Sequence, residues 1–446
     1  MSVDKKQTNA WGNAQKRHEQ ITANYGKHFC AAPWTSSWIS PTGDVTFCCK
    51  SRDTLGNINQ QNLPDILNSE SANVVRKQML AGGKPSHCRI CWGLEAASGN
   101  ASHNRVGNNR DGWANLDDAV AETNSDGSVR KFNISWFDLN SSNKCNFACL
   151  GCTPELSDTI RRNYLDEFAN INGRDAAGYT EQWNNKLPEP VQFENDRTRM
   201  IDFVMGQADT LKQIHLNGGE PWMQAGFHEL LDKLKAGGYH KTITLWTHTN
   251  GSISKYGGVD FVKDYYEPWT TARVSLSNDG CGKRGEFIRY GYSDRKWINT
   301  AQRLKQLDSE TKNVSVQSCI NSFNVLALDE TAEFVDQHIG LPQTAFGPWS
   351  GESLTTVASL GAIDPWFKQA ALEQLYKWRD KTWYSTLGDI ISNVEQTQPM
   401  EQYLQQQYAR KFVAAIRSLD SKRRVTLSEA CPELIDVMLR LEQLGK

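Results

Sequence analysis

The chain has 446 residues, of which 39% are hydrophobic and 15 are tryptophan, and its formal net charge is −2. This length and composition favour a folded globular protein of two or three units rather than a disordered chain. The near-neutral charge gives no electrostatic reason to expect nucleic acid or an anionic membrane as a partner. The sequence has no apolar run long enough for a membrane span and no apolar core of a signal peptide near its start, so we expect a cytoplasmic protein.

The eleven cysteines are the most informative part of the composition. The cytoplasm keeps thiols reduced, so a disulfide framework is not expected. Five cysteines lie in the first hundred residues and three lie in "CNFACLGC", residues 145–152. Clusters of this kind point to metal. Cys281, Cys319 and Cys431 stand alone and are interpreted as ordinary thiols.

The first 121 residues predict a small cysteine-rich unit. "PTGDVTFCC" (41–49) is typical of a β-hairpin, because Thr-Gly-Asp turns the chain between two strand-like runs. Such a hairpin would bring Cys30 near Cys48. "LPDILNSESANVVRKQMLAGG" (63–83) predicts one or two helices that lead to Cys88 and Cys91. The polar stretch "ETNSDGSVRK" (122–131) predicts a linker.

Strands and helices then alternate. Five strands are predicted at 132–140, 211–221, 242–251, 272–280 and 313–320. Three helices are predicted between or after them, at 226–238 with Phe227, Leu230, Leu231 and Leu234 on one face, at 296–307 with Ile298, Ala301 and Leu304 on one face, and at 327–339. This alternation is typical of parallel β/α units and suggests a full or partial barrel.

Residues 364–383 and 401–424 predict long amphipathic helices with charged outer faces. We interpret them as packing or interaction elements and assign them no chemistry.

Chemically distinctive motifs follow the predicted strands. The three cysteines, "NGGEP", "HTNG" and "SNDG" all stand where a strand ends. In a β/α barrel these ends form one face, which carries the active site.

The three-cysteine loop leaves one metal corner without a protein ligand. A structural zinc site needs four protein ligands, whereas a [4Fe–4S] cluster held by three thiolates keeps one iron for a small molecule. The C-x3-C-x2-C spacing of Cys145, Cys149 and Cys152 resembles the signature of radical S-adenosylmethionine (radical SAM) enzymes. The resemblance implies that these three thiolates hold a catalytic [4Fe–4S] cluster, whose open iron binds S-adenosylmethionine.

Further motifs extend this resemblance and imply contacts with S-adenosylmethionine. "GGEP" would hold its amino group, Ser277 of "SNDG" its ribose, and Arg289 of "EFIRYG" its carboxylate through bidentate pairing, while Asn250 of "HTNG" lies near the same face. The cofactor-binding residues implied are Gly218, Gly219, Glu220, Pro221, Asn250, Ser277 and Arg289. Many relatives carry an aromatic residue just before the third cysteine, and here that residue is Gly151.

The N-terminal cysteines resemble a second pattern. Cys30, Gly43 and Cys48 fit the C-x(9–15)-G-x4-C opening of SPASM and twitch modules, which bind auxiliary iron–sulfur clusters. The resemblance implies one auxiliary [4Fe–4S] cluster on Cys30, Cys48, Cys88 and Cys91, with Cys48 preferred over Cys49 because of the G-x4-C spacing. The spacing alone also permits a four-cysteine structural zinc site.

The module precedes the barrel, an order that resembles twitch-domain radical SAM proteins common in phage genomes. The resemblance implies an α/β fold with a partial (β/α)6-type radical SAM barrel. The expected domains are the twitch/SPASM-like module (1–121), the linker (122–131), the barrel (132–350) and a helical C-terminal region (351–446).

The function implied is reductive cleavage of S-adenosylmethionine to a 5′-deoxyadenosyl radical, followed by hydrogen abstraction from a peptide or protein. The auxiliary cluster would assist the oxidation, and an external reductant of the flavodoxin or ferredoxin type would supply the electron. Two alternatives stay open. One is modification of a carbohydrate, nucleoside or other small molecule, and the other is a non-catalytic, zinc-stabilised binding protein.

Overall fold

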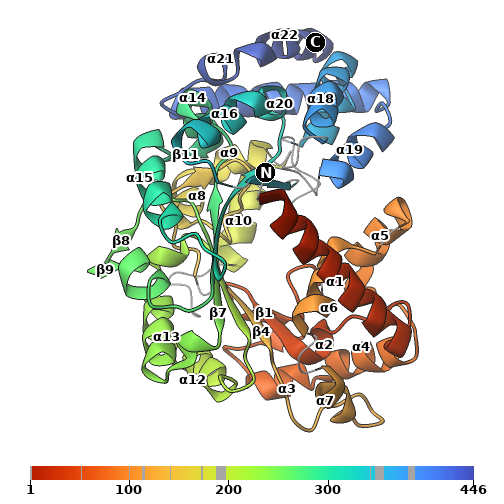
Figure 1. The fold of residues 1–446 in the computed structure, drawn as a ribbon. Helices are drawn as coiled ribbons and strands as arrows, with labels where there is room; N and C mark the ends of the chain where they lie inside the picture. The colour runs from red at the N-terminus through yellow and green to blue at the C-terminus, as the bar shows by residue number, and fades with distance from the viewer. Residues whose placement is uncertain are drawn as a thin grey trace. The chain divides into compact units, whose positions relative to one another are not determined.

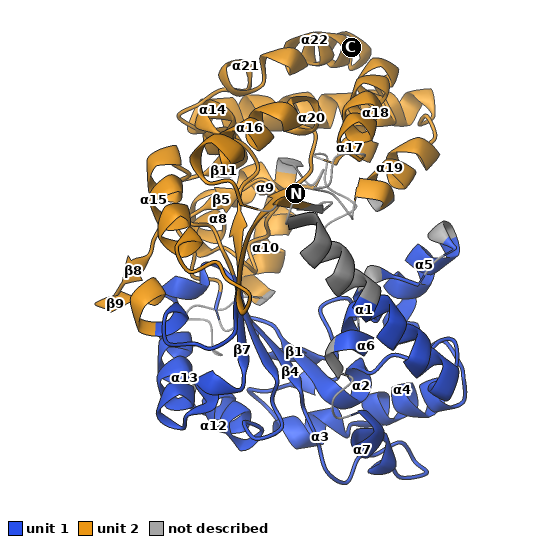
Figure 2. Cartoon of the chain, in the orientation of Figure 1, with its two compact units in different colours: residues 1–142, 189–247, 265–272 blue, residues 143–188, 248–264, 273–446 orange. Residues whose placement is uncertain are grey.

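The computed structural model describes residues 3–51, 53–99, 101–112, 116–140, 142–171, 174–186, 197–341, 343–346, 356–379 and 387–446. The chain forms two compact units (Figure 2): unit 1 comprises residues 1–142, 189–247 and 265–272, and unit 2 comprises residues 143–188, 248–264 and 273–446. The expected linker at 122–131 lies inside unit 1, where Thr123 and Val129 form an antiparallel bridge. The expected boundary at 350/351 lies outside the described residues.

Unit 1 contains a mixed sheet in the order β7-β6-β4-β1-β2-β3. Its strands are β1 (Ser36–Ile39), β2 (Asp44–Thr46), β3 (Gly56–Asn57), β4 (Trp136–Asn140), β6 (Gln213–Asn217) and β7 (Thr244–Thr249). β1, β4, β6 and β7 are paired in parallel, whereas β2 and β3 continue the sheet in antiparallel fashion. The pairing of β1 with β4 joins the cysteine-rich segment to the β/α segment, a connection that the sequence did not predict.

The predicted hairpin and helices of unit 1 are confirmed. β1 and β2 form the hairpin, and Gly43 turns it with φ of +83°, a conformation that side-chain-bearing residues rarely adopt. α13 (Ala225–Ala236) buries Phe227, Leu230, Leu231 and Leu234, the face predicted from the sequence. β4 is buried on both faces, as expected of an inner strand of a parallel sheet.

Figure 1 labels the remaining helices that the structure describes in unit 1. They are α1 (Val3–Tyr25), α2 (Ala32–Thr35), α3 (Leu63–Leu67), α4 (Glu70–Leu80), α5 (Arg89–Ser98), α6 (His103–Gly112), α7 (Leu116–Ala121) and α12 (Arg197–Gly206). The two helices α3 and α4 confirm the prediction for 63–83. α1 and α6 lie side by side in Figure 1.

Unit 2 contains the parallel pair β12 (Lys312–Cys319) and β13 (Gln343–Phe346), with β10 (Ala272–Ser277) beside β12. Its other short strands are β5 (Ala148–Cys149), β8 (Lys255–Tyr256), β9 (Val259–Asp260) and β11 (Arg289–Tyr290). The helices that follow the cysteine loop are α8 (Asp158–Asn163), α9 (Leu165–Ile171) and α10 (Ala176–Lys186).

The predicted helices of unit 2 are present as α15 (Asp294–Lys305) and α16 (Leu328–His338), with α14 (Gly282–Ile288) before them. α15 buries Trp297, Thr300, Ala301 and Leu304, while Ile298 is only half-buried. The predicted face is therefore rotated by about one residue, because the large Trp297 ring takes the central core position.

The C-terminal helices share a core with the β/α part of unit 2. They are α17 (Val357–Gly361), α18 (Pro365–Arg379), α19 (Leu387–Gln396), α20 (Gln402–Lys422), α21 (Leu427–Ala430) and α22 (Ile435–Leu444). One apolar cluster joins Phe412 and Leu419 of α20 to Phe287 of α14 and to Leu150 of the cysteine loop. Within the described part of the chain, no helix has the length and apolar character needed to cross a membrane.

Candidate functional site

Four of the N-terminal cysteines line one pocket in unit 1. Its walls include Cys30, Cys48, Cys88 and Cys91, together with the apolar side chains of Pro33, Phe47 and Trp92. Cys30 lies between α1 and α2, Cys48 follows β2, Cys88 ends a 3-10 turn, and Cys91 lies in the first turn of α5. Four separate segments of unit 1 thus close around a set of thiols, all of them free of disulfides.

Cys48, and not its neighbour Cys49, faces this pocket. Cys49 is absent from the pocket wall, and its thiol lies 4.0 Å from Asn104 Oδ1. The charge of Asp138 also acts on the Cys49 thiol. The chain turns here, because the Ser51 N–H donates to the Cys48 carbonyl at 3.0 Å, and of the two cysteines only Cys48 lines the pocket.

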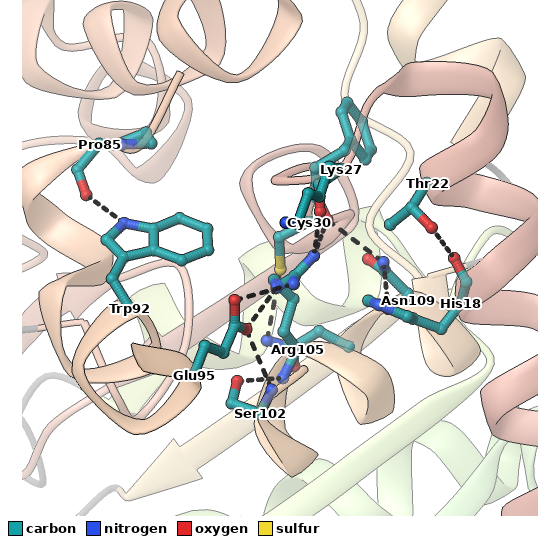
Figure 3. A network of polar contacts seen from close by, with 12 residues as sticks. His18, Thr22, Lys27, Cys30, Pro85, Trp92, Glu95, Ser102, Arg105 and Asn109 are labelled. Atoms are coloured by element: carbon teal, nitrogen blue, oxygen red, sulfur yellow. Dashed lines mark hydrogen bonds and ion pairs between the residues drawn. The ribbon is translucent and has the colours of Figure 1, made fainter. Parts of the chain in front are cut away.

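Polar donors approach the pocket thiols from α6. Asn104 Nδ2 lies 3.7 Å from the sulfur of Cys48, and Asn108 Nδ2 lies 3.7 Å from the sulfur of Cys30. Arg105 also lines the pocket. Its guanidinium pairs with both Glu95 oxygens, at 2.8 and 2.9 Å, and donates to the carbonyl of Lys27 at 2.9 Å (Figure 3).

Burial sets the protonation of these thiols. It raises the pKa of Cys30 to about 12, and it raises the pKa values of Cys48, Cys88 and Cys91 as well. Hydrogen bonds from Asn104, from Asn108 and from backbone N–H groups oppose this rise at Cys48. The pocket therefore disfavours four bare thiolates and suits thiols whose negative charge is taken up by a bound metal. Among the described residues, no three His, Cys, Asp or Glu side chains converge closely enough to hold one metal ion.

The three-cysteine loop lies in unit 2, where side chains at the start of α8 hold its backbone. Asp158 accepts a hydrogen bond from the Cys145 N–H at 2.8 Å, and Thr159 donates to the Cys145 carbonyl at 2.6 Å. Ser157 donates to the Phe147 carbonyl at 2.6 Å. β5 pairs with β11, which places Cys149 directly opposite Arg289. The loop is thus fixed at both ends.

Arg289 reaches the loop and carries a buried counter-ion. Its Nη1 lies 3.8 Å from the Cys149 sulfur, and its Nε lies 2.7 Å from Asp279 Oδ2. Burial acts to lower the pKa of Arg289, but the Asp279 carboxylate and the Cys149 thiol outweigh it and raise that pKa above its usual value. A guanidinium that stays charged inside the protein is suited to binding a further anionic group.

Cys319 is a fourth cysteine near this loop, and its isolated place in the sequence did not predict this. It ends β12, is buried, and its N–H donates to Asp279 Oδ1 at 2.7 Å. A Cβ atom added to Gly151 would lie 3.7 Å from the Cys319 sulfur. Cys319 therefore lies beside Gly151, the residue just before the third cysteine of the loop.

The structure brings two more predicted residues to the loop or close to it. Asn250 donates to Asn146 Oδ1 at 2.9 Å, so "HTNG" contacts the cysteine loop directly. Ser277 ends β10, two residues before Asp279, and its carbonyl accepts a hydrogen bond from the Trp297 ring at 3.0 Å.

Arg423, at the end of α20, is a loop contact that sequence reasoning missed. Its side chain donates to the carbonyl of Ala148 at 2.9 Å and to the carbonyl of Phe287. It also lies over the ring of Tyr290 at 5.4 Å. The C-terminal helices were assigned no chemistry, yet one of their side chains holds the backbone beside Cys149. The only signal was the basic run at 422–424.

"GGEP" lies in unit 1, after β6. Gly218 has φ of +115°, and a Cβ atom there would lie 2.7 Å from the Ser142 carbonyl oxygen, so only glycine fits. Gly219 N–H donates to the same carbonyl at 3.1 Å. Glu220 is buried and its carboxylate accepts a hydrogen bond from the Trp222 N–H at 3.3 Å, which caps the short helix that begins at Pro221. These residues are described within their own unit, separately from the cysteine loop.

Comparison with known proteins identifies the N-terminal segment. Residues 30–92 match the SPASM model, which describes an iron–sulfur cluster-binding domain. The chain carries a SPASM-type segment. All four pocket cysteines lie within the matched residues. The match confirms the prediction of a SPASM-type, iron–sulfur-binding segment at residues 30–92. No curated protein matches the chain.

Several solved structures are distantly similar. AdoMet-bound anSMEcpe is 17% identical over 55% of this chain and 59% of its own, with a TM-score of 0.33. Streptococcus suis SuiB bound to S-adenosylmethionine is 13% identical over 70% of this chain and 64% of its own, with a TM-score of 0.34. TYW1 with a lysine-pyruvate adduct is 15% identical over 46% of this chain and 60% of its own, with a TM-score of 0.24. The chain spans less than two thirds of each structure, and these TM-scores are too low to establish a shared fold.

Both cysteine sets fit the groups that they would hold. In unit 1, four thiols on one pocket match the four corners of a fully protein-ligated [4Fe–4S] cluster. In unit 2, the loop supplies three thiols, with a buried guanidinium beside the middle one. The donor set in unit 2 is therefore one thiol short of the four that would close a cluster, and a charged guanidinium lies beside it.

Proposed function

We propose that the protein is a radical SAM enzyme with one catalytic and one auxiliary [4Fe–4S] cluster. The observation that carries this proposal is the pairing of a three-thiol loop next to a buried arginine with a separate four-thiol pocket in a SPASM segment. In chain order, β4, β6, β7, β10, β12 and β13 are the strands of the proposed partial (β/α)6 barrel.

Cys145, Cys149 and Cys152 hold the catalytic cluster, and their loop leaves one iron for S-adenosylmethionine. When bound, the reduced cluster and S-adenosylmethionine supply a 5′-deoxyadenosyl radical that removes a hydrogen atom from the substrate. Arg289 binds the methionine carboxylate, and Asp279 keeps this guanidinium oriented through their 2.7 Å ion pair. Gly218, Gly219, Glu220 and Pro221 bind the amino group, Ser277 the ribose, and Asn250 orients the loop through Asn146.

Cys30, Cys48, Cys88 and Cys91 hold the auxiliary cluster. With four protein ligands this site has no corner for substrate, so its thiols serve to hold an electron acceptor for the substrate radical. A peptide or protein is the proposed substrate, because the SPASM and twitch enzymes that the chain resembles often modify peptides. A flavodoxin- or ferredoxin-type protein is the proposed electron donor.

Anaerobic reconstitution tests this function. The full chain is loaded with iron and sulfide, then treated with dithionite and S-adenosylmethionine, and iron and 5′-deoxyadenosine are quantified. We expect about eight irons per chain and 5′-deoxyadenosine formation. Cys149→Ala should lose about four irons and all cleavage, whereas Cys431→Ala, a buried thiol bonded to the Phe323 carbonyl, should keep both. Bound zinc without cleavage would replace this function with that of a zinc-stabilised binding protein.

A further inference from the structure

A helix outside the SPASM-matched residues supplies polar side chains to the four-cysteine pocket. α6 begins at His103, beyond the end of the match at residue 92. Asn104 and Asn108 are four residues apart, so they lie on the same face of this helix. Each donates a hydrogen bond of 3.7 Å to a different thiol, Asn104 to Cys48 and Asn108 to Cys30. α6 thus touches two of the four sulfurs.

Arg105 fixes the position of α6. Its guanidinium makes two hydrogen bonds to Glu95 on α5 and two more, of 2.9 and 3.2 Å, to the carbonyls of Lys27 and Phe29 (Figure 3). It is buried and also lies over the Trp92 ring, with 5.5 Å between the guanidinium carbon and the ring centre. Because Glu95 balances much of its charge, Arg105 acts mainly as a positioning residue that aims α6 at the pocket.

A second bond network holds the other side of α6. Asn109 is buried, accepts from the Ala31 N–H at 2.8 Å, and bonds the ring of His18 on α1 at 2.9 Å (Figure 3). Ala31 directly follows Cys30. The helix that carries the two donors is therefore tied to the chain on either side of Cys30, which keeps the Asn108 amide within reach of that sulfur.

Hydrogen bonds to ligand sulfurs change the reduction potential of an iron–sulfur cluster. When the cluster gains an electron, negative charge on its sulfurs increases, and N–H donors stabilise this reduced form more than the oxidised form. Asn108 is only 3% exposed, so water does not screen its amide. Donors in this place raise the potential.

We propose that α6 raises the reduction potential of the auxiliary cluster, with Asn104 and Asn108 as the hydrogen-bond donors and Arg105 as the positioning residue. This inference rests on the proposed function. In the reaction concerned, one electron enters the cluster, and no bond to iron forms or breaks. A higher potential makes the cluster a better acceptor for the electron that a substrate radical releases when it is oxidised.

The test is a redox titration of the full chain carrying Cys149→Ala, so that only the auxiliary cluster contributes to the electron paramagnetic resonance signal. Asn108→Leu removes the donor at similar size and should lower the equilibrium constant for one-electron reduction about tenfold, which corresponds to about 59 mV. Asn108→Asp adds negative charge and should lower it further. Asn104→Leu should act in the same direction.

Controls separate tuning from structural damage. Asn62→Leu changes an exposed asparagine that makes no side-chain cap on α3, and should leave the potential unchanged. Asn108→Ser keeps a donor, so it should recover part of the potential. Asn108→Ala also removes the donor, and it replaces Asn108→Leu if that variant fails to bind four irons. Full iron with an unchanged potential in both Asn104 and Asn108 variants would overturn the inference and leave the proposed function intact. Zinc in the pocket would overturn both.

Discussion

The two cysteine sites differ in how the protein treats its thiols. In unit 1 the four cysteines line a pocket and α6 donates hydrogen bonds to their sulfurs. In unit 2 the protein mainly holds the backbone of the loop, through Asp158, Thr159 and Arg423. In the proposed function, the first site is closed by four protein ligands, while the second is open and keeps a position for a ligand from outside.

This difference matches two chemical tasks. A closed site with four thiols exchanges electrons and nothing else, so its tuning is through hydrogen bonds and burial. An open site must bind and release a small molecule, so the protein supplies charge beside it rather than a fourth bond. Arg289 is that charge, and Asp279 keeps it charged and oriented in a buried environment.

The largest expected effect concerns the closed site. Cys48→Ala removes a thiol from the pocket, so iron should fall from about eight to about four per chain, while S-adenosylmethionine cleavage in unit 2 persists. Cys49→Ala removes a thiol that does not line the pocket and should keep all the iron. Iron analysis and 5′-deoxyadenosine assays on the two variants check this. Loss of iron in Cys49→Ala with full iron in Cys48→Ala would reverse the ligand assignment.

The open site should be most sensitive at its buried ion pair. Arg289→Met leaves Asp279 buried without its counter-ion, which should destabilise the protein by about 3–5 kcal/mol. Arg289→Met combined with Asp279→Asn removes both charges and should recover most of that loss. Urea unfolding at matched iron content measures the stability of the two variants. Equal stability of the single and double variants would show that the pair does not act as a buried unit.

The sequence predicted the elements better than their connections. Periodicity located α13, the β1–β2 hairpin and the strands of the β/α part, because burial of alternate or every third to fourth residue is a local signal. The pairing of β1 with β4 could not be predicted, because Ser36 and Trp136 are a hundred residues apart and neither carries a pairing signal.

The residues of the candidate sites also differ in how far the sequence could predict them. Cysteine spacing is local, so the three-cysteine loop and the SPASM segment could be recognised from the sequence. Asn108, Arg423 and Cys319 act on these cysteines from distant segments and belong to residue types that are common elsewhere in proteins. Only the fold shows that they meet.

A smaller effect concerns the pH dependence of stability, which involves His18 on α1 near the closed site. Burial, helped by the charge of Arg105, lowers the pKa of His18 from 6.5 to about 4. Between these pH values the unfolded chain binds a proton that the folded chain does not. The contribution of His18 to the free energy of unfolding should therefore be fully present above pH 6.5. The free energy of unfolding should fall by on the order of 3 kcal/mol as the pH drops towards 4. His18→Gln should remove this component, as measured by urea unfolding at pH 7 and pH 5 with the exposed His338 replaced as the control. If the free energy of unfolding changed equally between pH 7 and pH 5 in the original protein and in His18→Gln, this prediction would be contradicted.

The smallest expected effect concerns Gly151 and Cys319, which lie side by side at the open site. The question is whether Cys319 only fills space there or is also a ligand. A Cβ atom at Gly151 would lie at ordinary contact distance, 3.7 Å, from the Cys319 sulfur, so Gly151→Ala should change stability by less than about 1 kcal/mol. Gly151→Phe should collide with Cys319, and adding Cys319→Ala should relieve that collision, as thermal unfolding of the three variants would show. Cys319→Ala alone should keep all the iron, because three thiols and an outside ligand complete the cluster. Loss of iron in that variant would mean that Cys319 is a fourth ligand, and both sites would then be closed.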